Sequence, residues 1–179
     1  MIDLKTHNLL INKEVNENLE SILKRKLFSN GYIFYGSEGL GKKQTAIKFI
    51  EEIFNQYSSN SNIQEKIEDN NHPDFLLIEP TYLLKGNLIN RSLRGPSKHN
   101  KETIRVEQIR NLKTFLAQKS IESEKKIILI DDAHLLNEAA SNCLLKTLEE
   151  PTNGLFILLT SRLNSVSYTH LTLPTKRIV

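Results

Sequence analysis

Cysteine is almost absent from this 179-residue chain, which contains a single one, Cys143. One thiol excludes an internal disulfide framework and any zinc site built from cysteines, and it favours a reducing compartment. Long apolar runs are missing too, because charges are spread through residues 1–20 and no stretch there approaches the length of a membrane span or a signal segment. These absences predict a cytoplasmic protein with no membrane segment.

An excess of charge of one sign is also lacking. The 24 basic and 21 acidic residues leave a net charge of +3, which by itself does not indicate a surface that coats nucleic acid. With 39% hydrophobic residues the chain is long enough to bury a core, but it is too short for two full domains. We therefore expect one globular domain.

The spacing of apolar residues alternates along the chain between the helical and the extended period. Short, uniformly apolar runs predict buried strands, whereas spacings of three and four predict amphipathic helices. The expected strands are 32–35, 72–80, 125–130 and 154–161, and the expected helices are 15–28, 43–57, 104–118 and 137–150. This order predicts an α/β fold, a parallel sheet sandwiched by helices.

Two stretches between these elements are expected to be loops. Residues 58–71 are polar and contain neither glycine nor proline, so we expect an exposed connector with one helical turn. Residues 83–103 form a basic loop that contains Arg91, Arg94, Lys98 and Lys101. In the helix 137–150, Ala140, Cys143, Leu144 and Leu148 share one face and are expected to point into the core.

Residues 36–43, "GSEGLGKK", come close to a phosphate-binding loop (Walker A), G-x-x-x-x-G-K-[ST]. Gly36, Gly39 and Gly41 allow backbone N–H groups to turn toward a phosphate, and Lys42 supplies a positive charge. Lys43 stands where a serine or threonine would hold Mg²⁺, so the loop is degenerate. A plain strand-to-helix connector is the simpler alternative.

A second candidate motif follows the apolar strand 125–130, where Asp131 and Asp132 stand in the positions of a Walker B pair. In ATPases with this loop, the first acid orients metal-bound water and the next activates the attacking water. Active enzymes normally carry glutamate at the second position, and aspartate is one methylene shorter. Alternatively, the two acids cap the helix that follows. We expect no catalytic residue here.

Three segments carry a family resemblance: "HPDFLLIEP" at 72–80, "IRVEQIRNL" at 104–112 and "DDAHLLNEAASNCLLKTLEEP" at 131–151. Together they resemble the clamp-loader branch of the AAA+ family, and within it the delta-prime subunits of bacterial DNA polymerase III more than the ATP-hydrolysing gamma/tau subunits. The resemblance covers about residues 15–166. The expected domain is a P-loop AAA+ domain over residues 1–166.

The resemblance implies a role in DNA replication as a non-catalytic stator that helps to load the sliding clamp on primed DNA. It implies the other clamp-loader subunits, gamma/tau and delta, as partners, with the clamp and primer-template DNA reached through the complex. It also implies weak ATP binding at Gly36, Gly39, Gly41, Lys42 and Lys43 without hydrolysis.

The chain departs from the family at two places. Residues 57–74 lack the four-cysteine zinc module of many relatives, so we expect no zinc. After residue 166 the family continues with an arginine finger, a helical lid and a collar, whereas residues 167–179 read "SYTHLTLPTKRIV". This tail resembles translated adaptor sequence, and we expect it to be foreign to the family; a native short strand is the alternative.

Two other functions stay open from the sequence. One is a working AAA+ ATPase that tolerates Lys43. The other is a P-loop-derived module that binds DNA phosphates through the basic loop between Arg91 and Lys101.

Overall fold

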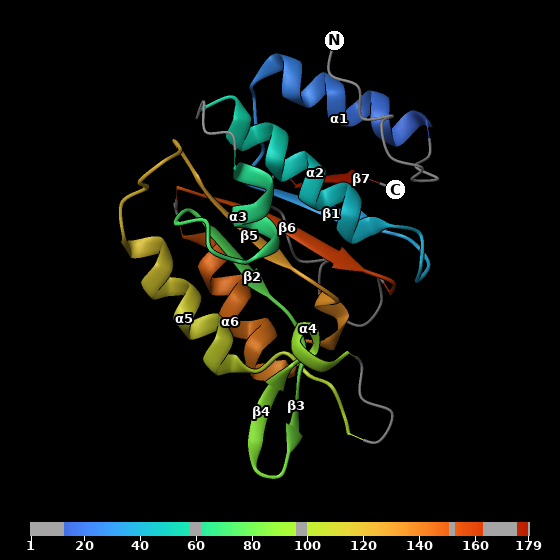
Figure 1. Cartoon of the computed structure of the whole chain (residues 1–179), viewed down its shortest axis with the longest axis vertical. Helices are drawn as coiled ribbons and strands as arrows, with labels where there is room; N and C mark the ends of the chain where they lie inside the picture. The colour runs from blue at the N-terminus through green and yellow to red at the C-terminus, as the bar shows by residue number, and fades with distance from the viewer. Residues whose placement is uncertain (1–12, 58–61, 96–99, 151–152, 163–174, 179) are drawn as a thin grey trace.

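A computed structural model describes residues 13–57, 62–95, 100–150, 153–162 and 175–178. A twisted sheet forms the centre of the molecule, and helices cover both of its faces (Figure 1). α1, α2 and α3 lie on one face, and α5 and α6 lie on the other. The sequence therefore folds into three layers, which confirms the expected α/β sandwich.

Helices and strands alternate along most of the chain. In chain order the elements are α1 (Lys13–Arg25), β1 (Gly31–Tyr35), α2 (Lys42–Asn55), α3 (Ile63–Glu68), β2 (Phe75–Ile78), β3 (Thr81–Leu84), β4 (Asn87–Asn90), α4 (Arg91–Arg94), α5 (Val106–Ala117), β5 (Lys126–Ile130), the 3₁₀ turn η1 (Ala133–Leu135), α6 (Glu138–Glu149), β6 (Gly154–Thr160) and β7 (Thr175–Ile178).

The main sheet has the strand order β2-β5-β6-β1-β7, and each pair of neighbouring strands is parallel. The register places Tyr35 of β1 beside Thr160 of β6, and Ile130 of β5 beside Leu158. The carboxyl ends of β1, β5 and β6 therefore lie together at one edge. In open parallel sheets, this is the edge where ligands bind.

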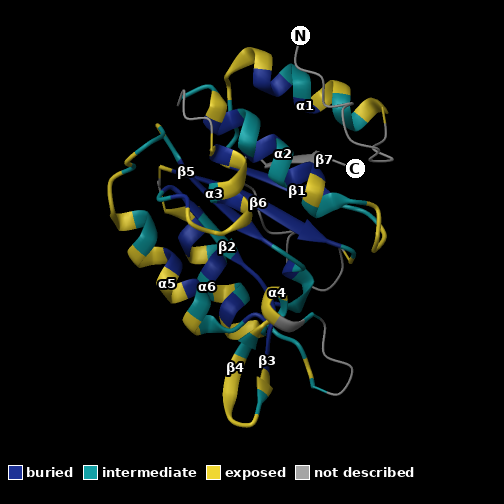
Figure 2. Cartoon of the chain, in the orientation of Figure 1, coloured by how far each residue is buried: buried dark blue, intermediate teal, exposed yellow. Residues whose placement is uncertain are grey.

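Two apolar clusters, one on each face of the sheet, make up the core. Alternate residues of β1, β2, β5 and β6 supply the two clusters, as the two-residue period of a strand requires. Phe49 of α2 packs on the first face against Tyr32 and Phe34, and Leu112 of α5 packs on the second face with Ile128. The central strands are buried along their whole length, whereas the β3–β4 hairpin is largely exposed (Figure 2).

The segment expected to be a basic loop contains an antiparallel hairpin, which corrects the sequence interpretation. β3 and β4 pair from Thr81 with Asn90 to Leu84 with Asn87. Lys85 and Gly86 turn the chain with φ values of 51° and 83°. Positive φ at both central residues is typical of a type I′ turn, the turn whose twist matches that of paired strands.

Three local expectations need adjustment. α1 ends at Arg25, three residues before the expected end, so Leu27 is 76% exposed. α3 is a longer helix than the expected single turn, and it buries Ile63 and Ile67 in the core. In α6, Ala140, Leu144 and Leu148 are buried as expected, but Cys143 is only half-buried against the second cluster.

The C-terminal strand β7 pairs in parallel with β1, from Gly31 beside Thr175 to Phe34 beside Ile178. Within the 167–179 tail, the structure describes this strand alone. The expectation that the tail is foreign to the family stays a prediction.

Gly154 marks a close approach between the sheet and α5. A Cβ atom at this position would lie 2.7 Å from Leu116 Cδ2 and 3.2 Å from both Ile128 Cδ1 and the ring of Phe156. Overpacking of a dense core usually costs about 1–3 kcal/mol, so we expect Gly154→Ala to lower the free energy of unfolding by about that amount. Urea denaturation measures the change.

The matched control for this prediction removes the obstacle. In a Leu116→Ala background, the added methyl group has room, so the second substitution should cost much less than it does in the wild type. A double-mutant cycle measures this coupling. Costs that simply add would contradict the close contact with Leu116.

Candidate functional site

The glycine loop connects β1 to α2 at the carboxyl edge of the sheet. Gly39 and Gly41 have φ values of 81° and 76°, in the left-handed region that favours glycine, and Gly41 is the N-cap of α2. The Nζ atom of Lys42 donates to the carbonyl oxygens of Gly36 at 2.9 Å and Ser37 at 2.7 Å. The loop thus curls around its own lysine, whose partners are neutral oxygens.

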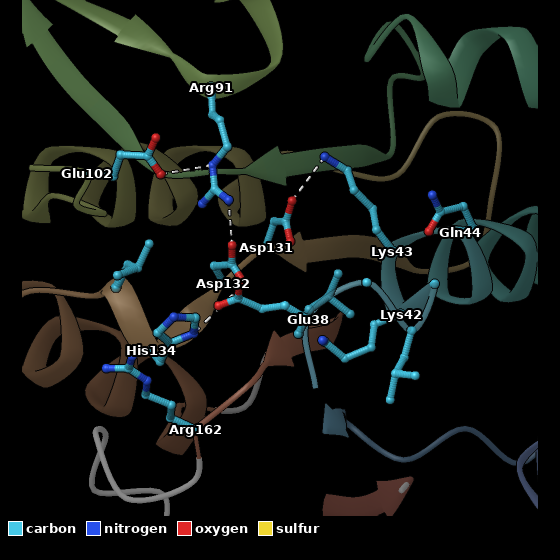
Figure 3. Close-up of a pocket in the computed structure, with 15 residues that line it drawn as sticks. Glu38, Lys42, Lys43, Gln44, Arg91, Glu102, Asp131, Asp132, His134 and Arg162 are labelled. Atoms are coloured by element: carbon cyan, nitrogen blue, oxygen red, sulfur yellow. Dashed lines mark hydrogen bonds and ion pairs between the residues drawn. The ribbon is translucent and has the colours of Figure 1, made fainter. Parts of the chain in front are cut away.

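Lys43, the residue in place of the metal-binding hydroxyl, forms an ion pair with the first strand-end acid. Its Nζ atom lies 3.0 Å from Oδ2 of Asp131, and the side chain of Asp131 is 16% exposed (Figure 3). Thr45 supplies no substitute hydroxyl, because it is buried and its Oγ1 atom donates to the carbonyl oxygen of Gly41 at 2.9 Å. A lysine ammonium therefore occupies the space between the loop and Asp131.

The second acid, Asp132, pairs with an arginine that sequence analysis did not connect to it. Nη1 of Arg91 donates to Oδ2 of Asp132 at 2.6 Å, and Nε of the same side chain lies 3.2 Å from Oε2 of Glu102. Burial lowers the pKa of Arg91, but the hydrogen bond to Asp132 and the nearby carboxylates outweigh burial and raise the pKa overall. Arg91 is thus a fixed cation between two acids.

The conformation of Asp132 also argues against the simpler alternative, in which its side chain caps the helix that follows. Asp132 is left-handed, with φ 48° and ψ 52°, and its side chain makes no capping hydrogen bond to η1. A non-glycine residue in this conformation is strained, and such strain tends to occur at functional sites. The Asp132 carboxylate pairs with the Arg91 guanidinium and does not cap the helix.

The β3–β4 hairpin and α4 bring Arg91 to the site. Asn90 ends β4, and the backbone N–H of Arg91 donates to the carbonyl oxygen of Pro80 at 3.2 Å, across the base of the hairpin. The next residue, Ser92, donates its backbone N–H at 3.1 Å and its hydroxyl to the carboxylate of Glu79. These bonds fix the start of α4 at the end of the hairpin, so Arg91 is held in place from both sides.

A cavity of about 780 Å³ opens between the loop, the two acids and the end of β6. Lys42, Lys43, Arg91 and the strand-end acids line it, and so do His134 and Arg162 (Figure 3). The side chain of His134 is 8% exposed, and its Nδ1 atom has no hydrogen-bond partner, although Oδ1 of Asp132 lies 3.9 Å away. Burial lowers the pKa of His134, an effect that Asp132 opposes, and the net shift favours the neutral imidazole.

The structure brings together all the residues that the sequence nominated: the loop with Lys42 and Lys43, and the acids Asp131 and Asp132. Sequence reasoning did not assign Arg91, Glu102 or His134 to this site. His134, two residues after Asp132, could have been found from its position beside the strand end. Arg91 and Glu102 carry no such signal, because both lie far from the motifs in the chain.

These residues do not fit a divalent metal. Mg²⁺ needs oxygen ligands in octahedral geometry, and the loop offers an ammonium where the hydroxyl should be. Both acids already bear a cation, Lys43 on Asp131 and Arg91 on Asp132. Among the described residues, no group of three or more histidines, cysteines or acids is arranged to hold a metal ion.

The basic segment between Arg91 and Lys101 is described only in part. Arg91 is engaged by two carboxylates, whereas Lys98 lies outside the described residues. Across the described segments, every helix is too short or too polar to span a bilayer.

Comparisons with known proteins agree with this fold. Residues 11–171 match the family model described as DNA polymerase III, delta subunit. The chain is 27% identical over 143 residues to DNA polymerase III subunit delta′ of Pseudomonas aeruginosa, covering 76% of this chain and 38% of the relative. It is also 27% identical over 159 residues to the delta′ subunit of Bacillus subtilis, covering 82% of this chain and 43% of the relative.

Among solved structures, the chain resembles a DNA polymerase III gamma subunit-related protein of Thermotoga maritima. The TM-score is 0.59 at 19% identity, over 90% of this chain and 45% of that one, which supports the AAA+ P-loop fold. The chain thus spans less than half the length of these relatives. Because the family model extends over nearly the whole sequence, the chain belongs to the DNA polymerase III delta subunit family, as the delta-prime resemblance of its motifs implied.

Proposed function

We propose that this chain acts in DNA replication as the P-loop domain of a delta-prime-type clamp-loader subunit, and that it is a stator that does not hydrolyse ATP. Its partners are then the other clamp-loader subunits, gamma/tau and delta. The sliding clamp and primer-template DNA are reached through that complex. The family membership supports the replication role, and the geometry of the site supports the non-catalytic part.

One observation carries the non-catalytic proposal: a protein cation is paired with each strand-end acid. A general base must be free to accept a proton from water, and Asp132 is tied to Arg91 at 2.6 Å. A metal-binding acid must be free to orient the metal's water, and Asp131 is tied to Lys43 at 3.0 Å. Both chemical roles are therefore blocked by contacts within the chain.

The rival functions have weaker support. A working ATPase would need both ion pairs to break and a metal ligand to be found elsewhere. A DNA-binding module that uses the basic segment would need Arg91, which pairs with Glu102 and Asp132. We therefore favour the stator.

ATP hydrolysis by the isolated chain tests the proposal. We expect phosphate release in the presence of Mg²⁺ to equal the buffer background. Lys43→Thr alone should stay at background, because Arg91 still neutralises Asp132. Hydrolysis that Lys42→Ala abolishes, and that Lys48→Ala leaves intact, would overturn the proposal, because Lys48 lies on the same helix outside the cavity.

A further inference from the structure

The β3–β4 hairpin presents an apolar pair of side chains to solvent. The hairpin extends away from the three layers of the domain (Figure 1), and most of it is exposed (Figure 2). Leu83 stands directly opposite Leu88, so the two side chains share a face, and they are 51% and 53% exposed. The other face is held against the domain, because Tyr82 on that face is buried. One side of the hairpin is therefore anchored, and the other carries half-exposed leucines.

The outer edge of β4 is open for pairing. Thr81 of β3 exchanges two backbone hydrogen bonds with Thr103, each 3.0 Å long, so its N–H and C=O groups point away from β4. In an antiparallel pair these directions alternate from residue to residue, so Leu83 and Leu88, two pairs further on, also direct theirs outward. Leu88 therefore offers a donor and an acceptor on the side of β4 where the described strands provide no neighbour. β4 also has no charged residue and no proline, the usual devices that prevent pairing at an edge.

The charges in and around the hairpin have one sign. Residues 81–101 contain five lysines and arginines and no aspartate or glutamate. Arg91 is paired with two carboxylates, but Lys85 at the turn and Lys101 near the base are exposed and form no ion pair with a described residue. A partner strand that carries acidic residues would therefore be attracted to this edge.

We propose that the outer edge of β4 binds an extended segment of a partner protein, in which apolar residues alternate with acidic ones. The segment adds a third strand to the hairpin and forms hydrogen bonds with the backbone of Leu88. Because alternate side chains of a strand point to opposite faces, its apolar side chains extend the face of Leu83 and Leu88, and its acids stay solvated in the field of the exposed lysines. This inference goes beyond the stator proposal and does not depend on it.

Two other occupants fit these observations less well. A second copy of the chain would bring together two hairpins that both carry Lys85 and lack acids, so like charges would oppose the pairing. A nucleic acid would be attracted by the lysines, but its phosphates offer acceptors alone, and the outward carbonyl oxygen of Leu88 needs a donor. An acidic strand supplies a donor, an acceptor and the opposite charge.

Fluorescence anisotropy of labelled peptides with the whole 179-residue chain tests the proposal. The probe is an acetylated peptide of about eight residues, within the usual length of a strand, in which glutamate alternates with valine. We expect it to bind at least about tenfold more tightly than the same peptide with lysine in place of glutamate, and added salt should reduce the difference. Prolines at the two central positions of the probe should abolish binding, because one of them removes a backbone donor in either register.

Two substitutions in the chain separate charge from backbone pairing. Lys85→Asn removes the charge and gives the turn an Asn-Gly pair, which favours the type I′ conformation and so preserves the hairpin. Affinity for the glutamate peptide should then fall about two- to fivefold, the range of one exposed ion pair. Leu88→Pro removes the outward N–H and the leucine side chain but no bond between β3 and β4, and affinity should fall about tenfold or more. Leu27→Thr, at an exposed leucine beyond α1, is the control and should bind like the wild type.

Four results would overturn the inference: no binding of the glutamate peptide, equal binding of the lysine peptide, or an affinity that either Lys85→Asn or Leu88→Pro leaves unchanged. Self-association that Leu88→Pro abolishes, measured by sedimentation equilibrium, would assign the edge to a second copy and overturn it too. Binding of a mixed-sequence oligonucleotide that Lys85→Asn weakens, without binding of the peptide, would assign the edge to nucleic acid. ATP hydrolysis tests the stator separately, so the two proposals can fail independently.

Discussion

Replacing Asp74 with alanine is expected to destabilise the domain by about 3–5 kcal/mol, because it removes several hydrogen bonds to a charged group, each of which contributes about 1.5–3 kcal/mol, and these contributions are not fully additive. Asp74 is 0% exposed at the entrance of β2. Its carboxylate accepts the backbone N–H groups of Ile121, Glu122 and Ser123 at 2.7–3.0 Å, together with the Ser123 hydroxyl at 3.2 Å. Alanine would leave these donors without an acceptor next to the first strand of the sheet.

Urea denaturation of Asp74→Ala measures this loss, with Asp69→Asn as the matched control. Asp69 is exposed at the end of α3, so its substitution should change the free energy of unfolding by no more than about 0.5 kcal/mol. A loss below about 1 kcal/mol for Asp74→Ala, typical of a single ordinary hydrogen bond, would mean that the 121–123 loop finds other acceptors.

The second large effect is expected at Phe49, the aromatic centre of the first core cluster. Its side chain is 1% exposed. Its ring packs edge-to-face on Tyr32, with ring centroids 5.4 Å apart, and lies tilted against Phe34, with ring centroids 6.4 Å apart. Phe49→Ala should cost about 3–5 kcal/mol, because it removes buried area and leaves a cavity between α2 and β1. Such a loss is a large fraction of the stability of a typical domain, about 5–15 kcal/mol.

The slope of the urea transition separates the two ways in which Phe49→Ala can act. An unchanged slope with a lower midpoint means lost stability, whereas a smaller slope means a looser native state. Leu27→Ala is the control, because Leu27 is 76% exposed beyond the end of α1 and should change little. A loss at Phe49 no greater than that at Leu27 would contradict the packing described here.

The order of β1, β2, β5 and β6 and of the long helices α1, α2, α5 and α6 could be predicted because the apolar residues in each of these elements repeat with the period of a single type of structure. β5 and β6 are buried at every residue, and their sequences are uniformly apolar apart from Lys126, Gly154 and Thr160. The proximity of Lys43 and Asp131 follows from the same reasoning, since parallel strands place their carboxyl ends at one edge. Those parts of the site depend on local sequence and on topology alone.

The contact between Arg91 and Asp132 could not be predicted in this way. The two residues are 41 positions apart, and the contact depends on the β3–β4 hairpin. The hairpin itself was missed because Lys85–Gly86 lacks the Asn-Gly or Asp-Gly pair that signals a type I′ turn. Asp74 was missed for another reason: nothing in "HPDFLL" indicates which backbone donors, 47 to 49 residues later, will surround its carboxylate.

The place of β1 in the sheet has a consequence for synthesis on the ribosome. β1 leaves the exit tunnel before β6, its partner in the core of the sheet, which begins only at Gly154. At about 5–20 residues per second, the ~120 residues between them take roughly 6–24 seconds to translate. During that time Tyr32, Phe34 and Phe49 have no completed sheet to pack on, so the segment that contains them exposes an aromatic surface until β6 has been made.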